Sequence, residues 1–267
     1  MLRLAVVLLA FSLSLSAQAQ TTQPSPSATK SAGNKKPSVK DGAAAGLSSQ
    51  PAPSRGGPCI GVIPLVGDRF SVQDIGLTVF GNEYKEIKVD NWGLDDLVVE
   101  RVRAAAGPHL ATRGILRTNP EVAALEPGLL RLSTQNDEKL AEALRQVVGS
   151  VRCQRYVVVF RSTHQWVGNQ SVYGIGVVNH GRAIVDNTTL HVLVRIFVHD
   201  GETLSVLKSA EGTTGGNNFI SGPPQKRLGA AMWPATPEAA NNPAMRKAAR
   251  ELLAEVLDKT LPGLLAP

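Results

Sequence analysis

Five consecutive apolar residues near the middle of the chain constrain the fold more than any other feature. Residues 156–160 read Tyr-Val-Val-Val-Phe without a polar interruption. A strand with one face in water alternates polar and apolar side chains, whereas a continuous apolar run needs protein on both faces. The sequence therefore predicts a central strand of a sheet that is covered on both sides.

Other apolar patterns surround this strand. Apolar side chains at helical spacing predict helices over 94–106 and 136–149. Asn242 followed by Pro243 is typical of a helix cap and first helical position, so a last helix is expected over 243–261. Further strands are expected at 60–66, 70–80, 84–89, 113–118, 172–178, 190–198 and 203–210.

Turn residues predict the register of two strand pairs. Gly81-Asn82 fits a two-residue type II′ turn between the second and third strands. A three-residue loop over 199–201 would place Ile196 opposite Leu204, which keeps apolar side chains on one face. The opposite face of the strand that carries Ile196 is expected to be a mixed surface of His191, Leu193, Arg195, Phe197 and His199.

The order of these elements predicts an α/β (α+β) fold. We expect a single mixed sheet with a C-terminal antiparallel meander and about three helices packed mainly on one face. Residues 211–241 are rich in Gly, Pro and Asn, and a loop of this length is usually functional or disordered. Residues 58–267 are expected to form a single domain with this long loop.

The first 19 residues have the pattern of a cleavable secretory signal peptide. Arg3 precedes an apolar run over 4–15, and the Ala-Gln-Ala of 17–19 supplies small residues for cleavage near Ala19. The run is shorter than the ~20 apolar residues of a transmembrane helix. We therefore expect a periplasmic or secreted protein with no transmembrane segment after cleavage. No Cys follows the run directly, so lipidation is not expected.

Residues 20–57 are expected to be a disordered linker. The segment consists mainly of Pro, Ser, Ala, Gly, Thr and Lys, and has no aromatic residue. It cannot bury enough apolar surface to offset the entropy of folding. Of the formal charge of +6, Arg3 contributes one and this segment four, which leaves +1 for residues 58–267. A nearly neutral domain does not indicate a nucleic-acid-binding surface.

The chain has two cysteines, Cys59 and Cys153, each placed just before an expected strand. If those strands are parallel neighbours, both cysteines lie at the same end of the sheet. In an oxidising compartment such a pair favours a disulfide. Two buried thiols that do not meet are the alternative.

The opening strand over 60–66, two helix crossovers and a closing helix resemble the periplasmic domains of the TolB amino-terminal, curli-secretion-channel and penicillin-binding-protein-activator type. The segments 61–65, 76–83 and 92–97 also look like those of uncharacterised exported proteins of proteobacteria. The resemblance implies a non-catalytic role in envelope assembly or as an adaptor. It implies no particular site residue.

The motifs of metal and cofactor sites are missing from the sequence. There is no C-x-x-C pair and no H-E-x-x-H. Gly174-Ile-Gly176 lies within a strand pattern and no helix follows it, so it does not indicate a dinucleotide loop. We therefore expect neither a metal nor a cofactor.

Polar side chains follow two apolar strands, at the edge where α/β sheets place ligands. Asp68 and Arg69 follow the first strand, and Arg161, Ser162 and His164 follow the central one. Ser162 and His164, with Asp68, could serve a serine-type hydrolase, although no G-x-S-x-G motif is present. A plain polar rim and a cleft for a small ligand or peptide are the other interpretations.

The leading functional expectation is a non-catalytic periplasmic or secreted domain that binds a protein or a cell-envelope component. A small-ligand-binding module and a serine-type hydrolase are the alternatives. Trp92, Trp166 and Trp233 fall in expected loops or at element ends, so they form either a buried lid over the sheet edge or an exposed patch for a partner.

Overall fold

The structure is a computed structural model, and it describes residues 57–76, 82–116, 137–149, 151–165, 170–180, 188–215 and 222–266. These residues belong to one unit formed by residues 50–267. The expected signal peptide, nearly all of the expected linker and Trp166 lie outside the described residues.

The expected central strand is confirmed as the middle strand of a five-stranded sheet, sheet A. It is β5 (Cys153–Arg161), and its residues Tyr156–Phe160 are at most 2% exposed. β5 pairs in parallel with β1 (Gly57–Leu65) and antiparallel with β10 (Val194–Asp200). The outer strands are β4 (Ala111–Gly114) beside β1 and β11 (Val206–Glu211) beside β10.

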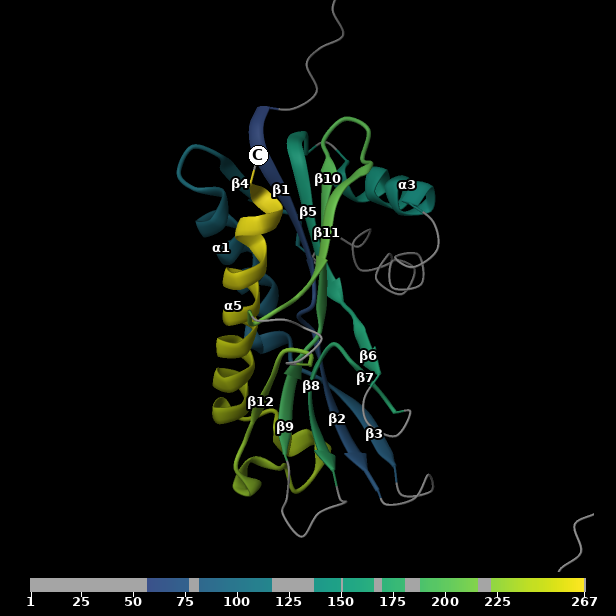
Figure 1. The fold of residues 1–267 in the computed structure, drawn as a ribbon, viewed down its shortest axis with the longest axis vertical. Coiled ribbons are helices and arrows are strands. Elements are labelled where there is room, and N and C mark those ends of the chain that lie inside the picture. The colour runs from purple at the N-terminus through teal and green to yellow at the C-terminus, as the bar shows by residue number, and fades with distance from the viewer. Residues whose placement is uncertain are drawn as a thin grey trace, which may run out of the picture. The chain divides into compact units, whose positions relative to one another are not determined.

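Helices cover both faces of sheet A, which explains the unbroken apolar run in β5. Val157 and Val159 belong to a core with α1 (Leu94–Ala106) and α5 (Pro243–Leu265). Val158 and Phe160 face the other way, into a core with α3 (Asp137–Val148). Figure 1 shows α1 and α5 on one side of the strands and α3 on the other.

Five more strands form a second sheet, sheet B, in the order β12-β9-β8-β2-β3. A short antiparallel pair, β6 and β7, stands apart. The mixed α/β class is confirmed, and the described residues contain three α-helices, but their strands divide into two five-stranded sheets and a pair rather than one sheet. The bounds are β2 Arg69–Ile75, β3 Glu83–Lys88, β6 Thr163–Gln165, β7 Ser171–Tyr173, β8 Ile175–His180, β9 Thr189–Val192 and β12 Gln225–Arg227.

The division arises because two expected strands are each broken by one residue. Gly174, with φ of +62°, separates β7 from β8, and Leu193 separates β9 from β10. At Leu193 the chain therefore leaves sheet B and enters sheet A. The core on the side of α1 and α5 nevertheless runs on beneath both sheets, since it also contains Val72 and Val177.

Both expected turn registers are wrong. Asp74 lies opposite Glu83, so the connection between β2 and β3 is longer than the two-residue turn expected at Gly81-Asn82, a turn that falls partly outside the described residues. Ile196 lies opposite Ala210 rather than Leu204.

The loop before β11 explains the second error. The Asp200 carboxylate accepts hydrogen bonds from the backbone N–H groups of Glu202 and Thr203, at 3.0 and 2.8 Å. Leu204 adopts a left-handed conformation (φ +58°) that turns its side chain into the α3 core, where it is 4% exposed. Because the loop extends to Ser205, β11 begins at Val206, later than a three-residue turn would allow.

The expected mixed surface on the 190–198 strand is also wrong, because most of its side chains are buried. His191 and His199 are fully buried and Phe197 is 4% exposed. Phe197 belongs to the α3 core. The backbone of Tyr173 in β7 lies beside the His191 imidazole.

The described residues 222–241 of the expected long loop contain regular structure. Within 211–241 lie β12 and two 3-10 helices, Ala230–Met232 and Pro237–Ala240. Asn242 caps α5 as expected, since its Oδ1 accepts from the Met245 N–H at 2.9 Å. The helix continues through Pro262 to Leu265 instead of ending at residue 261. None of the described helices has the length and apolar character needed to cross a membrane.

A disulfide between Cys59 and Cys153 is present, as one of the two interpretations expected. The parallel pairing of β1 with β5 brings the two cysteines together at one end of sheet A, with a Cα–Cα distance of 4.8 Å. Both side chains are buried in the α3 core. The bond closes a loop with a sequence separation of 94 residues.

Replacing both cysteines by alanine should lower the free energy of unfolding by about 4–5 kcal/mol, because the unfolded chain regains the entropy of a long loop. Denaturant unfolding of the oxidised protein and of the double variant measures the difference. The stability of the wild-type protein should fall on reduction and that of the double variant should not. Equal stability of the oxidised wild type and the double variant would contradict the expectation.

Burial lowers the pKa of His191 from 6.5 to about 4. Since the unfolded chain takes up this proton first, the stabilisation is complete above pH 6.5 and is lost as the pH falls towards 4. The loss should amount to roughly 3 kcal/mol. Urea unfolding between pH 7 and 4 should show this slope in the wild type and a flatter one in His191→Gln. The matched control is His109→Gln at an exposed site, which should keep the wild-type slope.

Candidate functional site

The two sheets separate at a closed ring of three backbone hydrogen bonds. The N–H of Ser162 donates to the carbonyl of Leu193 at 2.9 Å, and the N–H of Leu193 donates to the carbonyl of Gly174 at 2.8 Å. The N–H of Gly174 completes the ring by donating to the carbonyl of Ser162 at 2.9 Å. Each residue stands where one strand ends and the next begins, and we call this ring the seam.

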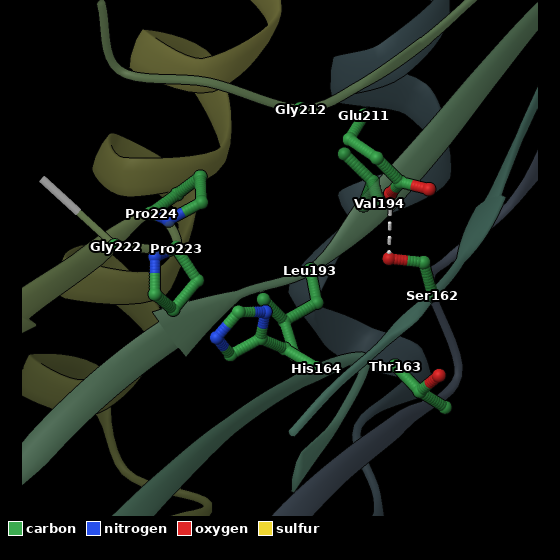
Figure 2. A pocket seen from close by; sticks show the side chains of 10 residues that line it. All are labelled: Ser162, Thr163, His164, Leu193, Val194, Glu211, Gly212, Gly222, Pro223 and Pro224. Carbon is green, nitrogen blue, oxygen red and sulfur yellow. Dashed lines mark hydrogen bonds between the residues drawn. The ribbon is translucent and has the colours of Figure 1, made fainter. Parts of the chain in front are cut away.

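A cavity of about 260 Å³ opens beside the seam. Its polar wall carries Ser162, His164 and Glu211, and Pro223 and Pro224 lie across from them (Figure 2). These side chains come from three separate parts of the chain: the segment from β5 to β6, the end of β11, and the residues before β12. The remaining lining residues are Thr163, Leu193, Val194, Gly212 and Gly222.

The hydroxyl of Ser162 is committed to a carboxylate. Its Oγ donates to Oε2 of Glu211 at 2.9 Å, and Oε1 of Glu211 lies 3.4 Å from Nε of Arg195. The Arg195 guanidinium in turn lies over the Phe197 ring, 5.1 Å from its centroid. A hydroxyl has one proton to donate, so in this arrangement His164 does not receive it.

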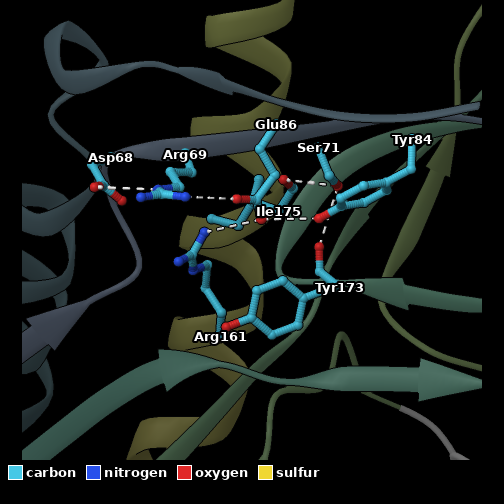
Figure 3. A network of polar contacts seen from close by, with 8 residues as sticks. All are labelled: Asp68, Arg69, Ser71, Tyr84, Glu86, Arg161, Tyr173 and Ile175. Carbon is cyan, nitrogen blue, oxygen red and sulfur yellow. Dashed lines mark hydrogen bonds and ion pairs between the residues drawn. The ribbon is translucent and has the colours of Figure 1, made fainter. Parts of the chain in front are cut away.

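Asp68, Arg69 and Arg161 lie in a separate polar network centred on Glu86 of β3 (Figure 3). Oε2 of Glu86 accepts from Nη1 of Arg69 at 3.1 Å, and Oε1 lies 3.7 Å from Nη1 of Arg161. Asp68 pairs with Arg69 at 3.9 Å. The Glu86 carboxylate therefore holds two arginines, and Asp68 joins the network only through Arg69.

Arg161 is the buried member of this network. It is 5% exposed, and its guanidinium lies 5.0 Å from the centroid of the Tyr173 ring. Gly174 allows this packing, since a Cβ there would lie 2.7 Å from Cδ of Arg161. Tyr84 closes the network by donating its hydroxyl to Glu86 at 2.9 Å. Burial, followed by this hydrogen bond to Glu86, raises the pKa of Tyr84.

The five residues singled out from the sequence thus fall into two groups. Ser162 and His164 line the cavity, whereas Asp68, Arg69 and Arg161 belong to the charged network. Asp68 is not a lining residue of the cavity, so it does not complete a triad with Ser162 and His164.

Sequence reasoning missed Glu86, Glu211 and the two prolines. Glu86 and Glu211 lie at strand positions where a charged residue reads as a solvated face. Strand pairing alone carries them to Arg161 and to Arg195. Gly174 was the available signal, because an isolated glycine in a strand pattern indicates a bulge or a close approach of another group.

The described tryptophans support the buried interpretation. Trp92 is fully buried, packs on Phe70 with ring centroids 4.9 Å apart, and donates its Nε1–H to Oδ1 of Asn241 at 2.8 Å. Trp233 is partly buried against the same core. In the described part of the chain, no group of three or more His, Cys, Asp or Glu side chains is placed to hold a metal ion.

Glu86→Gln should destabilise the protein by roughly 2–3 kcal/mol, because it removes the carboxylate beside a buried guanidinium. The value lies below that of a fully buried pair since Glu86 is 22% exposed. Arg161→Met added to Glu86→Gln should cost less than the sum of the two single changes, as a double-mutant cycle of urea unfolding would measure. Glu142→Gln removes an exposed ion pair on α3 and serves as the control. Additive costs would contradict the coupling.

Comparison with known proteins leaves the family of the chain open. No protein-family model matches it, and no curated protein matches it. Among solved structures, a Xanthomonas campestris protein of the DUF330 family model is similar over 80% of this chain and 89% of that chain, with 9% identity and a TM-score of 0.35. A likeness at this TM-score carries no argument about fold or function.

Proposed function

We propose that this chain is an exported, non-catalytic domain that binds a protein or a cell-envelope component through the cavity beside the seam. The observation that carries the proposal is the cavity itself, which gathers an acidic, a hydroxyl and an imidazole side chain opposite two prolines. Binding sites favour such a place, where neighbouring strands diverge and a few polar groups converge on an apolar wall.

The size of the cavity favours part of a larger partner over a free metabolite. Drug-sized ligands occupy pockets of about 300–1,000 Å³, and this cavity measures about 260 Å³. It suits one or two side chains of an extended segment better than a complete ligand of that class. A small-ligand-binding module remains the second candidate, supported by the same cavity.

The hydrogen bond from Ser162 to Glu211 favours a binding role over a catalytic one. A serine nucleophile needs a base that accepts its proton and is itself held by a third group. The Ser162 proton goes to a carboxylate whose side chain is 53% exposed and paired with Arg195. This arrangement orients a polar wall, and it lacks the desolvated base of a hydrolase.

The compartment forms part of the proposal. A disulfide persists in oxidising surroundings such as the periplasm, and the Cys59–Cys153 bond fits export by the N-terminal signal peptide with cleavage near Ala19. The resemblance to periplasmic assembly and adaptor domains rests on the order of elements and agrees with a binding role.

The test is site-specific photocrosslinking in envelope extracts. A benzophenone amino acid at position 164, which lines the cavity, should give one dominant ultraviolet-dependent adduct. The same group at exposed position 103 on α1 should not give that adduct. Filling the cavity with Ser162→Phe should abolish the adduct at position 164.

Two outcomes would overturn the proposal. Adducts of equal yield at positions 164 and 103 would show that contact is not specific to the cavity. Covalent labelling of the wild type by a fluorophosphonate, lost in Ser162→Ala, would instead support the serine-type hydrolase.

A further inference from the structure

Oxygen-bearing side chains form a row across sheet B. Glu83 of β3 lies opposite Asp74 of β2, and Asp74 lies opposite Asn179 of β8. Val178 is paired with Thr189, so the next position in the register brings Thr188 opposite Asn179. Residues opposite each other in neighbouring strands project to the same face. Three adjacent strands and the residue that precedes β9 therefore contribute one oxygen-bearing side chain each to one row.

The row lies on the side of sheet B that faces the main core. Phe70 and Val72 precede Asp74 on the same face of β2, and both belong to that core. Leu190 follows Thr188 on the same face of β9 and is fully buried in it. The row is thus the rim of the core, with Asp74 and Asn179 partly buried and Thr188 fully buried.

The two carboxylates of the row repel each other. Directly opposed like charges destabilise a strand pair, and burial together with the charge of Glu83 raises the pKa of Asp74. Lys85, the next residue on that face of β3, is engaged in an ion pair with Glu238. Asn179 donates a side-chain hydrogen bond to Asp74, which supplies a dipole but no positive charge.

The other half of the row holds two buried oxygens without a hydrogen-bond partner. Oδ1 of Asn179 and Oγ1 of Thr188 are both inaccessible, and neither has a partner in the described part of the chain. Leaving a buried polar atom unpaired costs ~1–3 kcal/mol, so such atoms usually have a partner such as a water or an ion. A bound cation would both neutralise the repelling carboxylates and give the unpaired oxygens of the row a partner.

We propose that this row binds a divalent cation of the calcium type. The carboxylates of Asp74 and Glu83 and the amide oxygen of Asn179 would be direct ligands, and the Thr188 hydroxyl would hold a water of hydration. Three neighbouring strands about 4.8 Å apart bring side-chain oxygens within reach of one ion. Thr188, one strand further, reaches the ion through water.

The mixture of ligands favours Ca²⁺ over Mg²⁺. Ca²⁺ accepts carboxylate, amide and water oxygens in irregular geometry, whereas Mg²⁺ requires a nearly ideal octahedron and gives up its waters reluctantly. A search for His and Cys spacings cannot find such a site, because strand pairing assembles it from residues up to 114 positions apart, from Asp74 to Thr188.

Calorimetric titration of CaCl₂ into the full chain without its signal peptide tests the proposal. We expect saturable binding, at least about tenfold tighter than with MgCl₂, and a melting temperature that rises with CaCl₂ concentration. Asp74→Asn should weaken binding at least about tenfold. Thr188→Val should weaken calcium binding by a smaller factor. Thr188→Ser should bind calcium with wild-type affinity, since serine keeps the hydroxyl.

Glu202→Gln is the matched control, because it removes an exposed carboxylate from a loop in sheet A and should leave binding unchanged. If Asp74→Asn does not fold, the exposed position Glu83→Gln gives the same test. No saturable heat with CaCl₂, a melting shift that NaCl of equal ionic strength reproduces, or wild-type affinity in a folded Asp74→Asn or Glu83→Gln would overturn the proposal.

Discussion

A ring of three backbone hydrogen bonds among Ser162, Gly174 and Leu193 determines how the rest of the molecule is arranged. At these residues β5 ends, β8 begins, and the chain passes from β9 into β10. Because the three segments satisfy one another, they separate from their previous partners without leaving buried backbone groups unpaired. The sheets can therefore divide above a shared core, and the cavity and the charged network both lie beside this division.

The seam explains why a buried arginine is tolerated next to it. Gly174 must lack a side chain for Arg161 to pass, and Glu86 must follow the pairing of β2 with β3 to reach the guanidinium. Removing either partner of such a pair costs more than the pair itself contributes. Arg161 is the last residue of β5, so the network holds the residue directly before Ser162 on the cavity wall.

The sequence was informative where a single element determines the outcome. The apolar run over 156–160 predicted a doubly covered strand, helical spacing predicted α1, and the positions of Cys59 and Cys153 suggested the disulfide. It was misleading where one residue changes the course of the chain. Leu193 interrupts an apparently regular alternation, and no property of leucine marks it as a crossing point between two sheets.

The candidate site likewise combines residues of one local segment with residues that only the tertiary fold brings together. Ser162 and His164 both line the cavity, and they lie two positions apart in the segment that follows the central strand. Glu211 and Pro224 come from segments about 50–60 positions further on, and only the folded sheets bring them to the cavity wall. The division of the first five candidates into two groups likewise depends on Glu86, a residue of a different strand.

Hydrogen–deuterium exchange of the protein, with and without a detergent extract of the envelope, tests the central claim most directly. The account predicts slower exchange in peptides that cover 162–165 and 211–215 when the extract is present. Peptides from α1 and from α5 should exchange at the same rate with and without the extract. Slower exchange confined to those helices, with the segments around the cavity unchanged, would contradict the claim that the cavity beside the seam is the binding surface.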